Sequence, residues 1–362
     1  MKKYLTRLFF AMIVLPTAVS CFDDMVVEQD IVVDPATTGV YILNSGMMDS
    51  NNSELTYFDM VTGSVAKNVF AGANGGKRLG DSGNDLLVYG NKMYIALTGS
   101  AVVFVTDLHG KVIEEVKVKG ESSNLCPRQM TAVNGKVYVT YLEGYVGAID
   151  TASFNVVKTK VGPYPEGIEY AYATNKLYVA ITDGNNYPNF ANKVQILDPY
   201  SLAIKGEIEV ACNPQTFHIA GNDAIYLVSW GDYGAKPAVL QKINPYTDEV
   251  TTIEGVAPTN MTIGANGKGY ILSSVYDENW NLSIKYYIYD LASDMVEGEL
   301  ISSGEIPQGY CIKADKVSGN IFIGTSDYVS NGDMYIVSPS GDILLKFDTG
   351  AINPHKICFF SN

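Results

Sequence analysis

The sequence predicts an all-β protein, a seven-bladed β-propeller of four-stranded antiparallel blades. Three observations predict this fold: a unit of short strands recurs along 362 residues, its period is 40 to 53 residues, and the chain holds 34 Gly, 14 Pro and 25 Tyr. Roughly 40 to 50 residues is typical of one propeller blade. Residues 127–150 are the clearest copy, with a proline, an apolar strand, an Asn-Gly turn, an aromatic strand and a third strand.

The second strand of every unit is centred on an aromatic residue between β-branched or aliphatic ones. These centres are Tyr41, Tyr94, Tyr138, Tyr178, Tyr226, Tyr270 and Phe322. An alternating strand, a turn and a short outer strand follow each centre, as exposed antiparallel strands require. We therefore predict seven consecutive four-stranded meanders.

The two ends of the repeat region predict how the ring closes. The first unit begins at Gly39 and lacks a first strand, whereas residues 353–360 form a proline-led strand with no partners after it. We expect this C-terminal strand to complete the first blade, because closure removes edges open to aggregation. The propeller would then span residues 39–362.

The N-terminus is typical of an exported protein. Lys2, Lys3 and Arg7 precede a short apolar run, and small residues lead to Cys21. Residues 1–20 resemble a bacterial lipoprotein signal peptide, with lipidation at Cys21, residues 21–38 as a tether, and acidic residues resembling the surface-export signal of Bacteroidetes. We expect a lipid-anchored outer-membrane protein at the cell surface; the alternative is an ordinary secretory signal with an incidental cysteine.

Charge and cysteine content exclude several classes of ligand. With 39 acidic and 25 basic residues, the chain does not have the basic face that nucleic-acid binding needs. Cys126, Cys212, Cys311 and Cys358 lack the spacing of a metal, redox or haem site. Cys311 and Cys358 each follow a proline by four residues, so we expect equivalent places, either as a disulfide or as two buried thiols.

Loops entering each first strand and loops joining second to third strands open on one face, because successive strands of a meander reverse direction. The long loops of this face are rich in Gly and Asn and carry aromatic residues. These are Tyr145, Tyr187, Phe190, Trp230, Tyr233, Tyr276, Trp280 and Tyr328. Such side chains favour a ligand or partner surface; alternatively, they pack down over the blade ends.

The first strands predict a polar mouth for the central channel. The residues after the opening proline, or at the aligned place, are Asn84, Arg128, Glu166, Gln215, Thr259, Gln308 and His355. Two positions on, Leu86, Met130, Ile168, Phe217, Met261, Tyr310 and Ile357 are apolar, which is a period-2 signal of packing beneath the mouth. The next ring, Leu87, Thr131, Glu169, His218, Thr262, Cys311 and Cys358, is mixed.

Three further residues complete the candidate ligand-binding set. Tyr164 precedes Pro165, and Lys77 and Arg78 lie in a long Gly-rich entry loop, residues 70–85. This loop is either a basic arm that closes over a ligand or a disordered surface loop.

The sequence does not favour an enzyme. The histidines are His109, His218 and His355, and carboxylates near the mouth, such as Glu166 and Glu169, lack a water-activating partner. Asp183 and Asp277 lie among Asn residues, a weak Ca²⁺ signal that turn preference also produces. We therefore expect no catalytic residue, no metal site and no catalytic cofactor.

The proline-led strand, the G/N-x-[VIL]-Y-[VIL] strand and the Asp-Pro or Asp-Thr turn resemble YncE-like seven-bladed propellers over residues 39–360. Among Bacteroidetes surface lipoproteins of this kind, the chain is similar to the BtuG family. That resemblance implies capture of a corrinoid such as cobalamin and its delivery to a TonB-dependent outer-membrane transporter. Asn84, Gln215 and Gln308 would face corrinoid amides. The alternative is an adhesion or assembly lipoprotein whose face binds a protein or a glycan.

Overall fold

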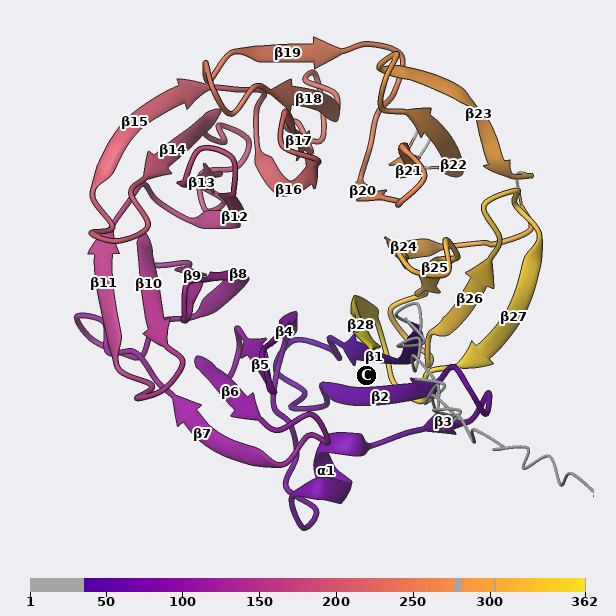
Figure 1. Ribbon diagram of the computed structural model, residues 1–362, viewed down its shortest axis with the longest axis horizontal. Coiled ribbons are helices and arrows are strands. Elements are labelled where there is room, and N and C mark those ends of the chain that lie inside the picture. The colour runs from indigo at the N-terminus through magenta and orange to yellow at the C-terminus, as the bar shows by residue number, and fades with distance from the viewer. Residues whose placement is uncertain (1–35, 277–280, 303, 362) are drawn as a thin grey trace, which may run out of the picture. The chain divides into compact units, whose positions relative to one another are not determined.

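The computed structural model describes residues 36–276, 281–302 and 304–361. Within these ranges, 28 strands form seven four-stranded antiparallel sheets arranged in a ring (Figure 1). The predicted fold class, a seven-bladed β-propeller, is confirmed. The one α-helix in this part of the chain is α1 (Val69–Ala73), and no helix there has the length and apolar character of a membrane span.

Each blade runs outward from an inner strand beside the central channel. Blade 1 contains β28 (Pro354–Ser361), β1 (Thr37–Asn44), β2 (Glu54–Asp59) and β3 (Val65–Ala66). Blade 2 contains β4 (Gly83–Tyr89), β5 (Lys92–Leu97), β6 (Val102–Thr106) and β7 (Val112–Val116). Blade 3 contains β8 (Pro127–Val133), β9 (Lys136–Tyr141), β10 (Tyr145–Asp150) and β11 (Val156–Lys160).

Blades 4 to 7 repeat this order without a crossover. Blade 4 contains β12 (Pro165–Ala171), β13 (Lys176–Ile181), β14 (Lys193–Leu197) and β15 (Ile204–Glu209). Blade 5 contains β16 (Pro214–Ala220), β17 (Ala224–Ser229), β18 (Val239–Ile243) and β19 (Val250–Ile253). Blade 6 contains β20 (Asn260–Ile263), β21 (Lys268–Tyr276), β22 (Leu282–Asp290) and β23 (Met295–Ile301). Blade 7 contains β24 (Gly309–Ala314), β25 (Ile321–Thr325), β26 (Asp333–Val337) and β27 (Ile343–Asp348).

The C-terminal strand closes the ring as predicted. β28 pairs antiparallel with β1, and Cys358 lies opposite Tyr41. β1 begins at Thr37, two residues before the predicted start at Gly39, because Thr37 Oγ1 donates a hydrogen bond to Asp315 Oδ1 of blade 7 at 2.8 Å. The predicted signal peptide (residues 1–20), Cys21 and most of the predicted tether lie outside the described residues.

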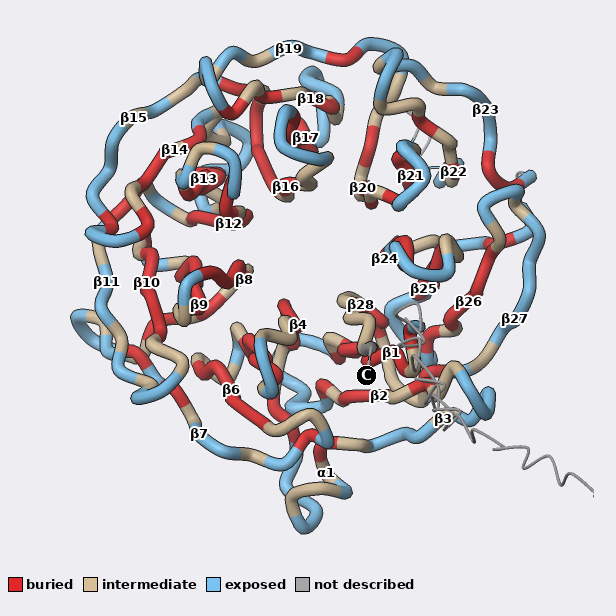
Figure 2. Tube along the Cα trace, viewed as in Figure 1, coloured by how far each residue is buried: buried red, intermediate tan, exposed pale blue. Residues whose placement is uncertain are grey.

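The repeated aromatic residues form the core of the blades. All seven centres are buried, with at most 4% of the side chain exposed. Several hydroxyls also fasten one blade to the next: Tyr138 donates to Pro199 O at 2.7 Å, Tyr178 to Asp248 Oδ1 at 2.6 Å, and Tyr226 to Asp294 Oδ1 at 2.7 Å. A buried hydroxyl needs such a partner. Buried stretches run through the inner and middle strands, whereas the outermost strands are mostly exposed (Figure 2).

The register of blade 7 corrects one prediction. Phe322 lies opposite Lys313, and a bulge brings Cys311 opposite Gly324. Lys313, and not Cys311, therefore holds the place of Cys358, and the four cysteines among the described residues are free thiols. The signal was in the sequence, since fifteen positions separate Pro307 from Phe322 but only eleven separate Pro127 from Tyr138.

This shift moves every predicted ring position in blade 7. Gly309 lies opposite Thr325, as Pro127 lies opposite Tyr141 in blade 3, so Gly309, and not Pro307, holds the place of the strand-opening proline. Tyr310 consequently replaces Gln308 in the polar mouth, and Ile312, which is 4% exposed, replaces Tyr310 in the packing ring.

Candidate functional site

The ring has two faces. The entry face is formed by the loops that lead into the inner strands and by the loops that join second to third strands. The turn face is formed by the turns that join first to second and third to fourth strands. The candidate ligand-binding residues lie on elements of the entry face.

A buried ion pair joins three blades at the mouth. Arg128 donates from Nε and Nη2 to the two carboxylate oxygens of Glu166, both at 2.8 Å. With its amide oriented to satisfy both partners, Asn84 accepts from Arg128 Nη1 at 2.7 Å and donates to Arg128 O at 2.9 Å. Burial opposes the charge of Arg128, but Glu166 raises the pKa of the guanidinium. Arg128 is therefore charged, neutralised within the protein, and acts as a clamp between blades.

A second ion pair lies directly beneath the first. Asp85 is 1% exposed; one carboxylate oxygen accepts from Met130 N at 2.7 Å and the other from Lys356 Nζ at 2.8 Å. Burial acts against the charge of Lys356, but the Asp85 carboxylate outweighs it and raises the pKa of the amine. Together the two pairs connect blades 1 to 4 along the channel wall.

Aromatic rings line the opposite side of the mouth. Tyr310 packs edge-on against Tyr328, with ring centroids 5.6 Å apart, and its ring lies 5.7 Å from that of His355. Burial, with the charges of Lys356 and Arg128, lowers the pKa of His355 to about 4, so the imidazole is neutral near pH 7. Tyr310 was absent from the predicted mouth because the prediction counted from Pro307, whereas Gly309, two residues later, holds the place that Pro127 has in blade 3.

Exposed aromatic side chains continue outward over blades 4 and 5. Phe190 contacts Tyr187 and Tyr233 in edge-on geometry, with centroid distances of 5.8 and 5.7 Å. Tyr187 and Tyr233 are nevertheless 66% and 63% exposed. Trp230 is fixed by a hydrogen bond from Nε1 to Thr259 O at 2.9 Å and remains 36% exposed.

The aromatic rim reaches blades 6 and 7 as well. Tyr276 at the end of β21 is 56% exposed, and Tyr328 in the β25–β26 loop is 55% exposed. Trp280, which was also predicted for this face, lies outside the described residues. These side chains present ring surface to solvent, although some also contact neighbouring blades, as Tyr328 contacts Tyr310.

The long entry loop of blade 2 is neither a closing arm nor disordered. Phe70 of α1 and Leu79 are 0% and 1% exposed, and they anchor the loop at the outer edge of the ring (Figure 1). Lys77 forms an ion pair with Glu115 of β7 and its amine lies 4.8 Å above the ring of Phe104. Arg78 is exposed beside it. Both cations therefore lie away from the channel mouth.

The other predicted residues differ in how close they lie to the channel mouth and in how exposed they are. Tyr145 opens β10, and its ring lies 4.9 Å from Lys158 Nζ, toward the outer strand. Gln215 is 7% exposed and donates its amide to Asn213. Gln308 is exposed one position before β24 begins. Burial raises the pKa of the Tyr164 hydroxyl, and the charges of the nearby Arg128–Glu166 pair also act on this pKa.

The arrangement offers stacking surface around a mouth whose charges are paired internally. In the part of the chain that the structure describes, no group of three His, Cys, Asp or Glu residues could hold a metal ion. The chemistry that the entry face presents is contact with aromatic rings plus a few amide and hydroxyl groups.

Comparison with solved structures shows the propeller fold and no more. A 6-phosphogluconolactonase described as putative, from Bacteroides uniformis, has a TM-score of 0.62 at 9% identity, covering 90% of this chain and 100% of that one. Hydrazine synthase of Kuenenia stuttgartiensis has a TM-score of 0.61 at 14% identity, covering 75% and 93%. The Cps50 β-propeller domain of Myceliophthora thermophila has a TM-score of 0.57 at 12% identity, covering 82% and 97%.

One family model matches the chain, whereas no curated protein does. One family model, a domain of unknown function named DUF5074, matches residues 38–303, which extend from the first strand to the end of blade 6. The chain is therefore a seven-bladed β-propeller that belongs to the DUF5074 family.

Proposed function

We propose that this protein is a cell-surface binding protein that captures a corrinoid on its entry face and delivers it to a TonB-dependent outer-membrane transporter. One observation carries the proposal: exposed aromatic side chains from the loops of blades 4 to 7 gather on the face that holds the channel mouth. Aromatic side chains on long loops are typical of a recognition surface, since leaving them in water is unfavourable.

The chemistry of the mouth supports a ligand that is large and weakly charged. Arg128 is neutralised by Glu166, and Lys356 by Asp85, so the mouth offers little uncompensated charge to a strongly anionic ligand. A corrinoid is a flat macrocycle fringed with amides. Tyr233 and Trp230 would cover its apolar faces, and Gln308, exposed just before β24, would face its amides.

The corrinoid and the transporter rest on the resemblance to the BtuG family. Anchorage through Cys21 would hold the protein at the outer membrane beside its transporter. The solved structures above are at most 14% identical and add only the fold.

The test is to mix the full chain with cyanocobalamin, separate it by gel filtration and measure affinity by calorimetry. We expect pink protein and a saturable heat. Trp230→Ala and Tyr233→Ala should each weaken binding about tenfold, as expected for loss of a buried aromatic contact. Tyr172→Ala and Tyr200→Ala are matched controls, because these side chains are 67% and 64% exposed on the turn face. Colourless protein with no heat across several corrinoids would exclude this ligand class.

A second function, a surface adhesion or assembly protein that binds a protein or glycan, is favoured by a separate observation. Met48 and Val329, in the second-to-third loops of blades 1 and 7, are 78% and 79% exposed and extend the apolar rim. If corrinoids fail to bind, Met48→Ser and Val329→Ser should weaken attachment of the protein to surface glycans or to partner cells.

A further inference from the structure

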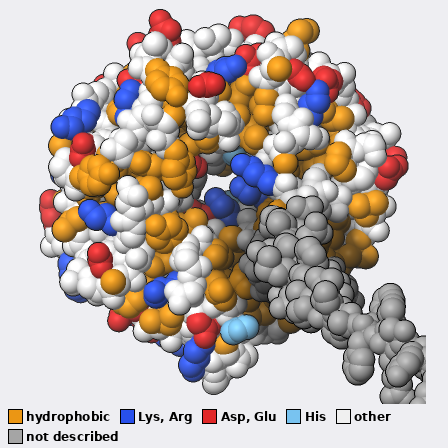
Figure 3. Space-filling view, viewed as in Figure 1, with side chains coloured by type: hydrophobic (Ala, Val, Ile, Leu, Met, Phe, Trp, Pro, Cys, Tyr) orange, Lys and Arg blue, Asp and Glu red, His pale blue; other side chains and the backbone are white. Residues whose placement is uncertain are grey.

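Two lysines at the channel form no ion pair with a described carboxylate. Lys313 lies on β24 and Lys316 in the turn that follows it. Among the described residues, neither amine forms an ion pair or hydrogen bond, whereas Lys356 pairs with Asp85 at 2.8 Å. Lys and Arg side chains gather around the central opening of the face shown in Figure 3. In a chain of net charge −14 this is a local exception.

The charge of Lys313 acts across the channel. Lys313 pairs with Phe322, as Glu169 pairs with Tyr178 and His218 with Tyr226, so the three side chains lie at the same depth. β12 and β16 stand across the ring from β24 (Figure 1). Burial lowers the pKa of Lys313, and so does the charge of Lys356. An anion between Lys313 and Lys356 would relieve the repulsion between the two ammonium groups.

The carboxylates of the channel wall are already engaged. Glu166 and Asp85 are held by Arg128 and Lys356. Glu169 accepts the hydroxyl of Thr131 at 2.9 Å and attracts Lys313 without forming an ion pair with it; burial raises the pKa of its carboxyl group, which weakens it as a counter-charge. The positive charge of Lys313 and Lys316 is therefore left for a ligand to balance.

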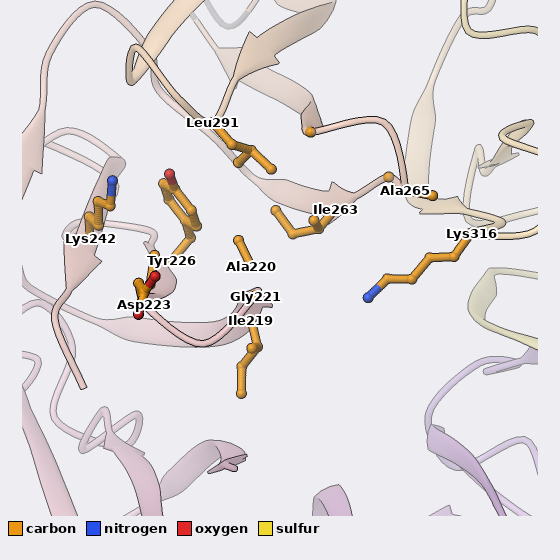
Figure 4. Close-up of a pocket in the computed structure, with 13 residues that line it drawn as sticks. Ile219, Ala220, Gly221, Asp223, Tyr226, Lys242, Ile263, Ala265, Leu291 and Lys316 are labelled. Atoms are coloured by element: carbon orange, nitrogen blue, oxygen red, sulfur yellow. The ribbon is translucent and has the colours of Figure 1, made fainter. Parts of the chain in front are cut away.

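Space for a ligand lies beside Lys316. A cavity of about 470 Å³ on the turn face is lined by turns of blades 5, 6 and 7. Figure 4 shows the Lys316 side chain pointing toward Ile219 and Ile263 of the cavity wall. Lys242, a second cation of the lining, is engaged by Asp294 at 2.6 Å, so Lys316 is the one free to meet an anion within the described lining.

We propose that Lys313 and Lys316 bind a small multivalent oxyanion, a phosphate or a polycarboxylate, at the turn-face end of the central channel. Two ammonium groups three residues apart supply charge-assisted hydrogen bonds to such a group. The acidic surface of the chain repels large polyanions, which favours a small free anion that can enter the channel. The site is separate from the entry face and does not depend on corrinoid binding.

The experiment titrates the full chain by calorimetry at low ionic strength with inorganic phosphate and, in a parallel series, with citrate. We expect saturable one-site binding of at least one of them. Tighter phosphate binding would assign a compact tetrahedral oxyanion, and tighter citrate binding a polycarboxylate. Heat without saturation for both anions would overturn the proposal.

Two variants and a control locate the site. Lys313→Met and Lys316→Gln should each weaken binding about tenfold, the usual effect of losing one hydrogen bond to a charged group. Lys111→Gln is the matched control, because Lys111 is an exposed lysine of a turn-face turn in blade 2. Equal weakening by the control would mean nonspecific screening and would overturn the proposal. If circular dichroism shows that Lys313→Met does not fold, the Lys316→Gln variant decides by itself, and an unchanged affinity for this variant would overturn the proposal.

Discussion

The two faces of the ring are built by different rules. On the turn face, the turns between third and fourth strands repeat one device: Asp150 Oδ1 accepts from Ser153 N and Oγ, both at 2.8 Å, and Asp198 holds Ser201 in the same way. On the entry face, the loops differ in length and side chains from blade to blade. Turns that satisfy backbone hydrogen bonds between strands are constrained to repeat the same residues. The longer loops of the entry face do not have this constraint, so their length and side chains can vary and can serve recognition.

The faces also differ in how their channel charges are balanced. At the entry mouth, Arg128 and Lys356 are each neutralised by a buried carboxylate. Toward the turn face, Lys313 and Lys316 have no such partner among the described residues. The ion pairs at the entry mouth therefore hold the blades together. At the turn-face end of the channel, the unpaired lysines can bind an external anion, as proposed above. Three substitutions test this contrast.

The largest effect is expected at the entry mouth. Glu166→Gln would leave the Arg128 guanidinium buried without its counter-charge, and we expect the free energy of unfolding to fall by about 3 kcal/mol. Urea denaturation at pH 7 measures it. Glu207→Gln is the control, because its pair with Lys193 is exposed and should contribute less than about 0.5 kcal/mol. Equal losses for both would refute the clamp.

The next effect concerns pH and the channel interior. Burial, with the charges of Lys313 and Lys356, lowers the pKa of His218 to about 3, well below the unfolded value near 6.5. The unfolded chain therefore binds a proton that the folded chain does not, so the stability from neutral His218 is present above pH 6.5 and is lost as pH falls. Between pH 7 and pH 4.5, wild type should lose about 2 kcal/mol more than His218→Gln. Parallel acid profiles would show that His218 is not held neutral.

The smallest effect is expected at the fasteners of the turn face. Tyr178→Phe removes the hydroxyl that bonds Asp248 of the next blade, and should cost about 1 kcal/mol. Tyr94→Phe is its internal control, because the buried Tyr94 hydroxyl has no hydrogen-bond partner among the described residues, and this change should be neutral or slightly stabilising. If Tyr94→Phe lowered the free energy of unfolding as much as Tyr178→Phe, the hydrogen bond from Tyr178 to the next blade would not be what stabilises the protein.

Much of the architecture could be predicted from local pattern. The spacing of the aromatic centres predicted seven blades, and the unpaired strand after Asn353 predicted closure by β28. The Asn134–Gly135 turn was also predicted, and both residues take positive φ, 50° and 73°, as a two-residue hairpin turn requires. These features depend on periodicity and on turn chemistry, which the sequence displays directly.

The site could be predicted only in outline. Counting from prolines placed Gln308 and Cys311 in the channel rings, but Gly309, and not Pro307, holds the strand-opening place, so Tyr310 and Lys313 lie there. Residue type predicted that Lys77 would serve the ligand face, yet its ion pair with Glu115 draws it to the outer edge of blade 2. Strand register and a long-range ion pair both depend on neighbouring strands, so counting residues from a proline within one strand does not determine them.

The sequence by itself determined the seven-bladed ring and the division into two faces, because strand period, turn residues and an aromatic core position are local and repeated. Only the tertiary structure decided which charges are neutralised. Arg128 meets Glu166, and Asp85 meets Lys356, from different blades, whereas Lys313 forms no ion pair within the described residues. The physical reason is that electrostatic compensation depends on distance across the channel, and residues 271 positions apart in the chain, such as Asp85 and Lys356, become neighbours only when the ring closes.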